Sequence, residues 1–280
     1  MKKLQLRKMF FAFLTALLVL SGCATTPAQR NLVLPGDHGH LAAQLHVPAH
    51  QKEYPLVLIL HGFNASKDMP LLTELAKQLN AHGIATLAFD FNGHGQSEGS
   101  FVDMTIPNEL EDARRVYQYA RQLPHVSSVA LVGHSQGAVV AAMLAGELGA
   151  QHIKALALMS PAPELKEDVA SGNLFGVTFD PKNPPPFITL ANGLKVGRDY
   201  LQTTQQIPVY EESAKYTGPV LVLHSQDDQL VPYQYGKQMS EVYQNAHLET
   251  LHGFDHNFTQ DTPAADKLVT NFLIEQLLNK

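Results

Sequence analysis

Residues 129–148, VALVGHSQGAVVAAMLAGEL, decide the fold that this sequence predicts. Apolar residues 129–132 suit a buried strand, Gly-His-Ser-Gln-Gly follows at 133–137, and a strongly apolar run that suits a helix comes next. Between a strand and a helix, this pattern is typical of a tight turn that pushes its serine out over the C-terminal edge of a sheet. Unpaired N–H groups at the start of the helix favour negative charge there. The stretch therefore predicts that Ser135 is a nucleophile.

Two further side chains are needed, because a serine hydroxyl is a weak nucleophile until a base takes its proton. With a serine on this kind of turn, the acid and then the histidine follow it along the chain. His256 is the predicted base, since it lies in a loop after the last predicted strand, whereas the competing His252 falls nearer the strand end. Asp228 is the predicted acid that orients the imidazole, and the neighbouring Asp227 stays open as an alternative.

Two backbone amides are predicted to bind the negative oxygen that develops during acyl transfer. His61-Gly62-Phe63 directly follows a predicted strand at 55–60, where a second oxyanion donor belongs. The N–H of Phe63 and that of Gln136, the residue after the serine, should together form this oxyanion hole. Such donors each contribute on the order of 3 kcal/mol to the transition state.

Buried strands alternate with helical patterns along most of the chain. Two short apolar runs, 32–34 and 41–47, flank Pro-Gly-Asp and predict an antiparallel hairpin. The remaining strands are predicted at 55–60, 84–89, 129–132, 153–159, 220–224 and 248–251, with helices between most of them and one at the C-terminus. This alternation predicts an α/β fold, a mostly parallel sheet covered by helices on both faces.

One segment, residues 161–210, interrupts that alternation. It is rich in Pro, Gly and Asn and includes three consecutive prolines at 184–186. A long insertion of irregular structure in a compact domain is usually functional or disordered. We therefore expect an irregular segment that forms a small lid over the site.

With these elements in place, the sequence resembles the bacterial cinnamoyl (feruloyl) esterases of the α/β-hydrolase superfamily. The resemblance covers about residues 56–272. It is carried by HGFN at 61–64, FDFNGHGQSEG at 89–99, residues 104–105 with 108–109, the turn at 133–137, and the insertion's residues 161–162, 165–166 with 168, 176–178, 200–201, 205–206 and 208–211. The resemblance implies an α/β-hydrolase fold and hydrolysis of esters between an aromatic acid and an alcohol or sugar.

The resemblance also implies a set of substrate contacts within the lid. An aspartate and a tyrosine of the lid contact the phenolic hydroxyl in that family, and they match Asp168 and Tyr200 here. Phe175 stands where family members carry a glutamine, which implies a more apolar pocket with a preference for less hydroxylated or aliphatic acyl groups. Ser225 replaces a glycine in the motif before the acid.

The N-terminus predicts export. Four basic residues precede an apolar run at 9–20, which is too short to span a bilayer as a mature helix and is typical of a signal peptide over residues 1–22. Leu-Ser-Gly-Cys at 20–23 resembles the lipobox of bacterial lipoproteins, so Cys23 is the expected site of acylation. Residues 23–30 are then a polar tether without regular structure, and 31–280 the α/β-hydrolase domain. The protein would be anchored by lipid (palmitate-type acyl chains) at the outer membrane or periplasmic face of a two-membrane cell, or otherwise at the cell surface.

The charge and the cysteine content limit the kinds of partner and cofactor that we expect. Removing the four basic residues of the signal takes the formal charge from −6 to −10, which disfavours nucleic acid. A single cysteine leaves no internal disulfide, and the chain has no clustered Cys/His spacing typical of a metal site. We expect no cofactor or metal, a small-molecule ester as substrate, and a membrane contact through the lipid. The oligomeric state stays open.

Three other interpretations fit parts of the pattern. A general carboxylesterase of lipase type and a serine peptidase use the same fold and the same catalytic groups. A surface-anchored binding lipoprotein without activity belongs to a different class. Such a protein would be expected to lack one of the three catalytic residues, and the sequence carries candidates for all of them.

Overall fold

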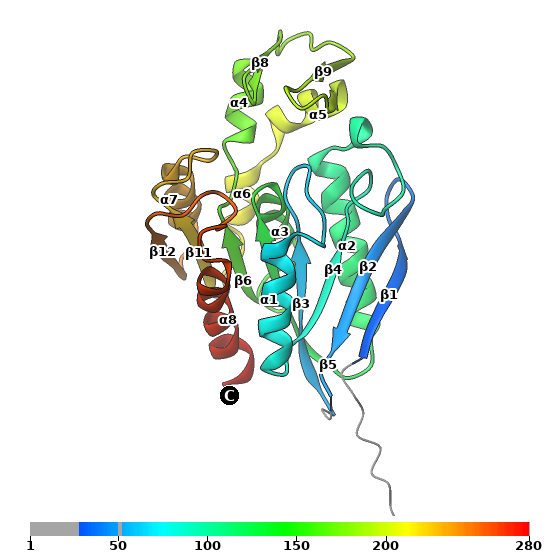
Figure 1. Ribbon diagram of the computed structural model, residues 1–280, viewed down its shortest axis with the longest axis vertical. Helices are drawn as coiled ribbons and strands as arrows, with labels where there is room; N and C mark the ends of the chain where they lie inside the picture. Colours follow the sequence, from blue (N-terminus) through cyan, green and yellow to red (C-terminus); the bar gives the residue numbers. More distant parts are fainter. Residues whose placement is uncertain (1–27, 50–51, 280) are drawn as a thin grey trace, which may run out of the picture.

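The computed structural model describes residues 28–49 and 52–279. Within them, an eight-stranded sheet runs in the order β1-β2-β4-β3-β5-β6-β11-β12 (Figure 1). The strands are β1 (Ala28–Pro35), β2 (His40–Val47), β4 (Ala85–Phe89), β3 (Tyr54–Leu60), β5 (Val126–His134), β6 (Ile153–Met159), β11 (Val220–Ser225) and β12 (Ala246–Leu251). The six strands from β4 to β12 are parallel, and β2 is antiparallel to both of its neighbours, β1 and β4.

Helices cover both faces of the sheet, which explains why the central strands contain continuous apolar stretches such as 56–60 and 155–159. Alternate residues of β3 point to opposite faces: Leu56 and Leu58 pack in one core cluster, Val57 and Ile59 in the other. The first cluster is covered by α2 (Ile106–Gln122), α3 (Gln136–Leu148), α6 (Val209–Ser213) and α7 (Tyr233–Glu241), and the second by α1 (Pro70–Ala81) and α8 (Thr262–Leu278), which lie side by side. The architecture is the α/β-hydrolase fold that the sequence predicted.

The predicted strands and the hairpin are all present, with ends that move by a few residues. The helix α7 was not predicted. It is short, and Gly236 and Met239 are its buried residues, so it lacks the apolar stripe that reveals a helix in a sequence. None of the helices within 28–49 and 52–279 is both long enough and apolar enough to cross a bilayer.

The expectation of an irregular insertion was wrong. Residues 161–210, here called the lid segment, form α4 (Leu165–Ser171), β7 (Asn173–Leu174), β8 (Val177–Thr178), β9 (Phe187–Thr189), β10 (Lys195–Gly197), α5 (Arg198–Thr203) and the short 3₁₀ helix η2 (Thr204–Gln206), and they run into α6. Two small hairpins pair β7 with β8 and β9 with β10. Strands of two or three residues are too short to show a period in sequence. Figure 1 shows the lid segment beyond the C-terminal ends of the parallel strands.

The predicted tether needs a smaller correction. Residues 28–30 begin β1, where they pair with residues 45–47 of β2. An edge strand is held by backbone hydrogen bonds on one side, so polar side chains such as Gln29 and Arg30 do not prevent it. The predicted signal peptide, Cys23 and the rest of the tether lie outside the described residues.

Candidate active site

Ser135 lies on the sharp turn between β5 and α3, at the C-terminal edge of the sheet. Its backbone has a φ of 55°, a left-handed conformation that costs energy for a non-glycine residue. Glycines make the turn possible, since a Cβ on Gly133 would collide with the Gly137 carbonyl and one on Gly137 with the His61 carbonyl. Helix α3 is apolar on all sides and buried, so the turn is clamped between packed elements. The sequence thus places strain at the residue predicted to react.

Asp228 and His256 form a directly bonded pair. The Nδ1–H of His256 donates to Oδ2 of Asp228 at 2.7 Å, and the amides of Leu230 and Val231 donate to Oδ1 at 2.8 and 2.9 Å. Burial alone would raise the pKa of Asp228, but hydrogen bonds from His224 and His256 outweigh it and lower that pKa well below its usual range. The carboxylate therefore stays ionised and can stabilise a protonated imidazole.

The competing residues occupy different positions. Asp227 is exposed and accepts a hydrogen bond from the Gly253 amide at 2.6 Å, so it ties two loops together. His252 is exposed as well. The sequence offers Asp227 or Asp228 as the acid and His252 or His256 as the base. The structure pairs Asp228 with His256 and places this histidine beside the serine.

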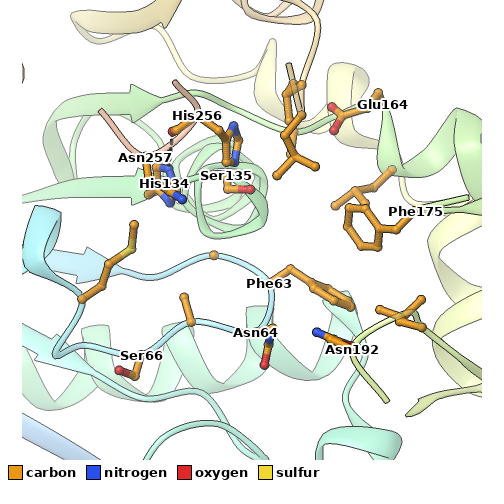
Figure 2. A pocket seen from close by; sticks show the side chains of 18 of the residues that line it. Phe63, Asn64, Ser66, His134, Ser135, Glu164, Phe175, Asn192, His256 and Asn257 are labelled. Atoms are coloured by element: carbon orange, nitrogen blue, oxygen red, sulfur yellow. Dashed lines mark hydrogen bonds between the residues drawn. The ribbon is translucent and has the colours of Figure 1, made fainter. Parts of the chain in front are cut away.

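Ser135 and His256 line the same cavity, and Figure 2 shows the imidazole next to the serine side chain. Nε2 of His256 is buried without a hydrogen-bond partner, and the Ser135 hydroxyl makes no hydrogen bond to any described residue. Hydrogen bonds between catalytic groups are often long in structures without substrate and tighten when it binds. The arrangement leaves the unpaired nitrogen available to take the hydroxyl proton.

The loop that carries His256 is fixed from two sides. Nε2–H of His134, the residue before the serine, donates to the His256 carbonyl at 3.0 Å. Burial lowers the pKa of His134 to about 3, so this ring is neutral at ordinary pH. Beyond the histidine, the Asp255 carboxylate accepts from the amides of Asn257 and Thr259 at 3.1 and 2.9 Å. This role of His134 in holding the His256 loop was not predicted from the sequence, although the residue lies within the motif at 133–137.

The two predicted oxyanion donors are unpaired. Phe63 follows β3, Gln136 begins α3, and neither amide donates to any other described residue. The Gln136 side chain is locked behind the turn, because its Nε2 donates to Glu109 Oε2 at 2.9 Å and its Oε1 accepts from the Tyr200 hydroxyl at 2.7 Å. Burial raises the pKa of Glu109 well above its usual range. This buried chain of groups holds the residue whose amide should bind the oxyanion.

Two of the three predicted lid contacts lie away from the cavity wall. Tyr200 is fully buried beneath Phe63, with 5.9 Å between ring centroids, and its hydroxyl is taken by Gln136. Asp168 is partly exposed on α4 and is not among the residues that line the cavity. Phe175 does line it, next to Phe63 with 5.1 Å between ring centroids.

The cavity has a volume of about 790 Å³ and a largely apolar wall. Phe63 and Phe175 form one side, with Asn192 and Glu164 nearby (Figure 2). Leu190 also lines the cavity. The sequence offered no signal for Glu164, because an acidic residue at the start of a lid helix resembles an ordinary helix-end charge. Among the described residues, no group of three or more His, Cys, Asp or Glu side chains is arranged to hold a metal ion.

Comparisons with known proteins concern the fold and the family. Residues 51–182 match the family model described as serine aminopeptidase, S33, and residues 195–280 match one described as TAP-like protein. A solved structure of Est1E from Butyrivibrio proteoclasticus with bound ferulic acid is 33% identical, with a TM-score of 0.84 over 88% of this chain and 98% of that one.

Curated relatives are more distant. Human protein ABHD12B is 29% identical over 79% of this chain, and the lysophosphatidylserine lipase ABHD12 of Danio rerio is 26% identical over 82%. The matched region spans 61% of the length of each of these two proteins.

Proposed function

Because the chain belongs to the α/β-hydrolase family, we propose that it is a serine esterase that hydrolyses esters of aromatic, cinnamoyl-type acids through an acyl-enzyme. The observation that carries the proposal is that His256, which is hydrogen-bonded to Asp228, lines the same cavity as Ser135. The unpaired amides of Phe63 and Gln136 complete the set of groups that acyl transfer needs.

In the proposed mechanism, Nε2 of His256 takes the Ser135 proton as Oγ attacks the ester carbonyl. The carbonyl oxygen becomes negative and is bound by the amides of Phe63 and Gln136. The carbon–oxygen bond to the alcohol then breaks, and the imidazolium gives its proton to the leaving alcohol. Water repeats the sequence on the acyl-enzyme, releasing the acid and restoring the serine. Asp228 stays ionised and stabilises the imidazolium at each stage.

The aromatic acyl group is supported by the cavity wall. The rings of Phe63 and Phe175 lie 5.1 Å apart and face the space beside Ser135, where a flat conjugated ring could pack against them. The relative with bound ferulic acid supports the same substrate class. With Phe175 in place of a polar residue, acyl groups with fewer hydroxyls should be favoured.

Lipid esters are the second candidate, favoured by the curated relatives that are named lysophosphatidylserine lipases. Leu230 is 53% exposed and Phe175 39% exposed, and both line the cavity, so an acyl chain could be accommodated there. A serine peptidase is the third, suggested by the description of the matched family model.

A substrate panel separates these activities. Initial rates are measured on methyl cinnamate, methyl ferulate, a lysophospholipid and an aminoacyl amide, with wild type and Ser135→Ala. We expect the methyl esters to give the highest kcat/KM, and the variant to lose nearly all turnover, since losses of about a million-fold are typical of nucleophile knockouts. Higher kcat/KM on the lysophospholipid would replace the aromatic proposal, and full activity in the variant would end the esterase one.

We also propose export and lipid anchoring at Cys23. The support is the sequence alone, a basic start and an apolar run followed by Leu-Ser-Gly-Cys. In a bacterial host, the wild type should sediment with membranes and carry a mass increment on residue 23. Cys23→Ser should move to the soluble fraction, and an unmodified, soluble wild type would contradict the proposal.

A further inference from the structure

A buried carboxyl group without an assigned role faces the catalytic cavity. Glu164 lies just before α4, where the chain leaves β6 and enters the lid segment. The residue is 5% exposed, lines the cavity, and its Oε2 has no hydrogen-bond partner. Figure 2 shows Glu164, Phe175 and Phe63 on the same side of Ser135. A buried polar atom normally has a partner, so this oxygen calls for one that the protein itself does not supply.

The charge around Glu164 decides which kind of partner fits. Burial raises the pKa of Glu164 well above the usual range and outweighs its own backbone amide, which acts in the opposite direction. The negative charges of Asp168, Asp228 and Glu167 also raise this pKa. A carboxyl group in this setting is neutral at ordinary pH and carries an O–H, so it can donate a hydrogen bond. The matching group is an oxygen acceptor on the substrate.

We propose that Glu164 is a specificity-determining residue, whose carboxyl group donates a hydrogen bond to an ether oxygen, such as that of a methoxy group, on the aromatic ring of the acyl group. The inference rests on the proposed esterase function, because it assigns the space beside Phe63 and Phe175 to the acyl ring. A ring oxygen there would supply the partner that Oε2 lacks. An unsubstituted ring would leave the carboxyl unpaired and pay the cost of a buried polar group.

Two substrates isolate the donation. Methyl 3,4-dimethoxycinnamate has ring oxygens that only accept hydrogen bonds, and methyl cinnamate has none. The measured quantity is the ratio of kcat/KM for the first ester to that for the second. The purified full chain is compared with Glu164→Gln, which keeps a donor, and with Glu164→Leu and Glu164→Met, which remove it. Glu167→Gln on the exposed side of α4 is the matched control, and thermal unfolding identifies variants that fold.

We expect a ratio of about ten in wild type, from one gained hydrogen bond. The ratio should change little in Glu164→Gln and in the control, and should fall to about one in either apolar variant that folds. A purely structural role would lower activity on both esters and leave the ratio unchanged. That result would overturn the inference, as would a wild-type ratio near one or a loss of the preference in Glu164→Gln.

A cationic partner gives a different result. If the site were built for a substrate ammonium group, wild type would prefer an aminoacyl methyl ester and Glu164→Gln would lose that preference, which also contradicts the inference. Failure of the function itself is distinct, because wild type would then hydrolyse none of these esters and no ratio could be formed.

Discussion

Tyr200→Phe separates two roles for a buried hydroxyl. The family resemblance assigns Tyr200 to the phenolic hydroxyl of the substrate, whereas the structure gives its O–H to Gln136 at 2.7 Å. Phenylalanine keeps the ring that packs under Phe63 and removes only the donor. If the hydroxyl positions Gln136, the loss should affect every ester, because the oxyanion amide serves them all.

The size of the effect follows from the contact. The bond is between neutral groups and fully buried, and Gln136 Oε1 would lose its donor, which costs about 1–3 kcal/mol of unfolding free energy. For a chain of this length, about 2–4 °C per kcal/mol gives a fall in Tm of about 2–12 °C. Glu109 still accepts a hydrogen bond from Nε2 of Gln136, so the backbone N–H of Gln136 should shift without being lost from the oxyanion hole. We therefore expect kcat to fall by on the order of tenfold. Outright removal of an oxyanion donor costs about 10²–10³.

The assay is steady-state kinetics on methyl ferulate and methyl cinnamate, with Tm measured in parallel. Tyr216→Phe is the matched control, since its buried hydroxyl donates to the Ile153 carbonyl at 3.0 Å and lies outside the cavity lining. The control should lose stability and keep kcat. A Tyr200→Phe enzyme that is impaired on the ferulate but normal on the cinnamate would refute the positioning role and restore direct substrate contact.

Two further predictions concern acidic residues. Asp228→Asn should lower kcat by about 10⁴, whereas Asp227→Asn should keep most activity, because the Asp227 side chain accepts a hydrogen bond from the Gly253 amide and not from His256. Equal losses of kcat at saturating ester would contradict this assignment. Burial raises the pKa of Asp266 in α8 from 3.8 to about 8. Between these pH values the folded chain holds a proton that the unfolded chain has lost. The free energy of unfolding should therefore fall as the pH rises through that window, by up to about 1.4 kcal/mol per pH unit. Asp266→Asn cannot ionise, so urea unfolding from pH 5 to 8 should show a flatter profile and higher stability at pH 7; parallel profiles would contradict this.

The parts of the fold that were predictable have strong local signals. Residues 129–148 predict a strand, a turn and a helix in succession. Continuous apolar runs such as 55–60 are typical of strands in a sheet that is covered on both faces. The positions of Ser135, His256 and the two amides relative to the strand ends then follow from the topology. In the structure, Ser135, His256 and Phe63 line one cavity, and Gln136 directly follows the serine.

Other features depend on contacts that no local pattern encodes. Asp227 and Asp228 are adjacent and chemically identical, and the amides of Leu230 and Val231 on Asp228 distinguish them only once the loop is folded. The partner of Tyr200 lies 64 residues away along the chain, and the hairpins of the lid segment are too short to have a period. Glu164 was not predicted either, because its burial in the cavity wall depends on tertiary packing and not on the residues next to it in the sequence.

The central claim is that Ser135 is activated by His256 and reacts with ester carbonyls. The most direct measurement is active-site labelling with a fluorophosphonate, followed by peptide mass spectrometry of wild type, Ser135→Ala and His256→Ala. The account predicts one label, on Ser135, that is absent in the first variant and forms orders of magnitude more slowly in the second. A label on another residue, or equally fast labelling of Ser135 without the imidazole, would contradict it.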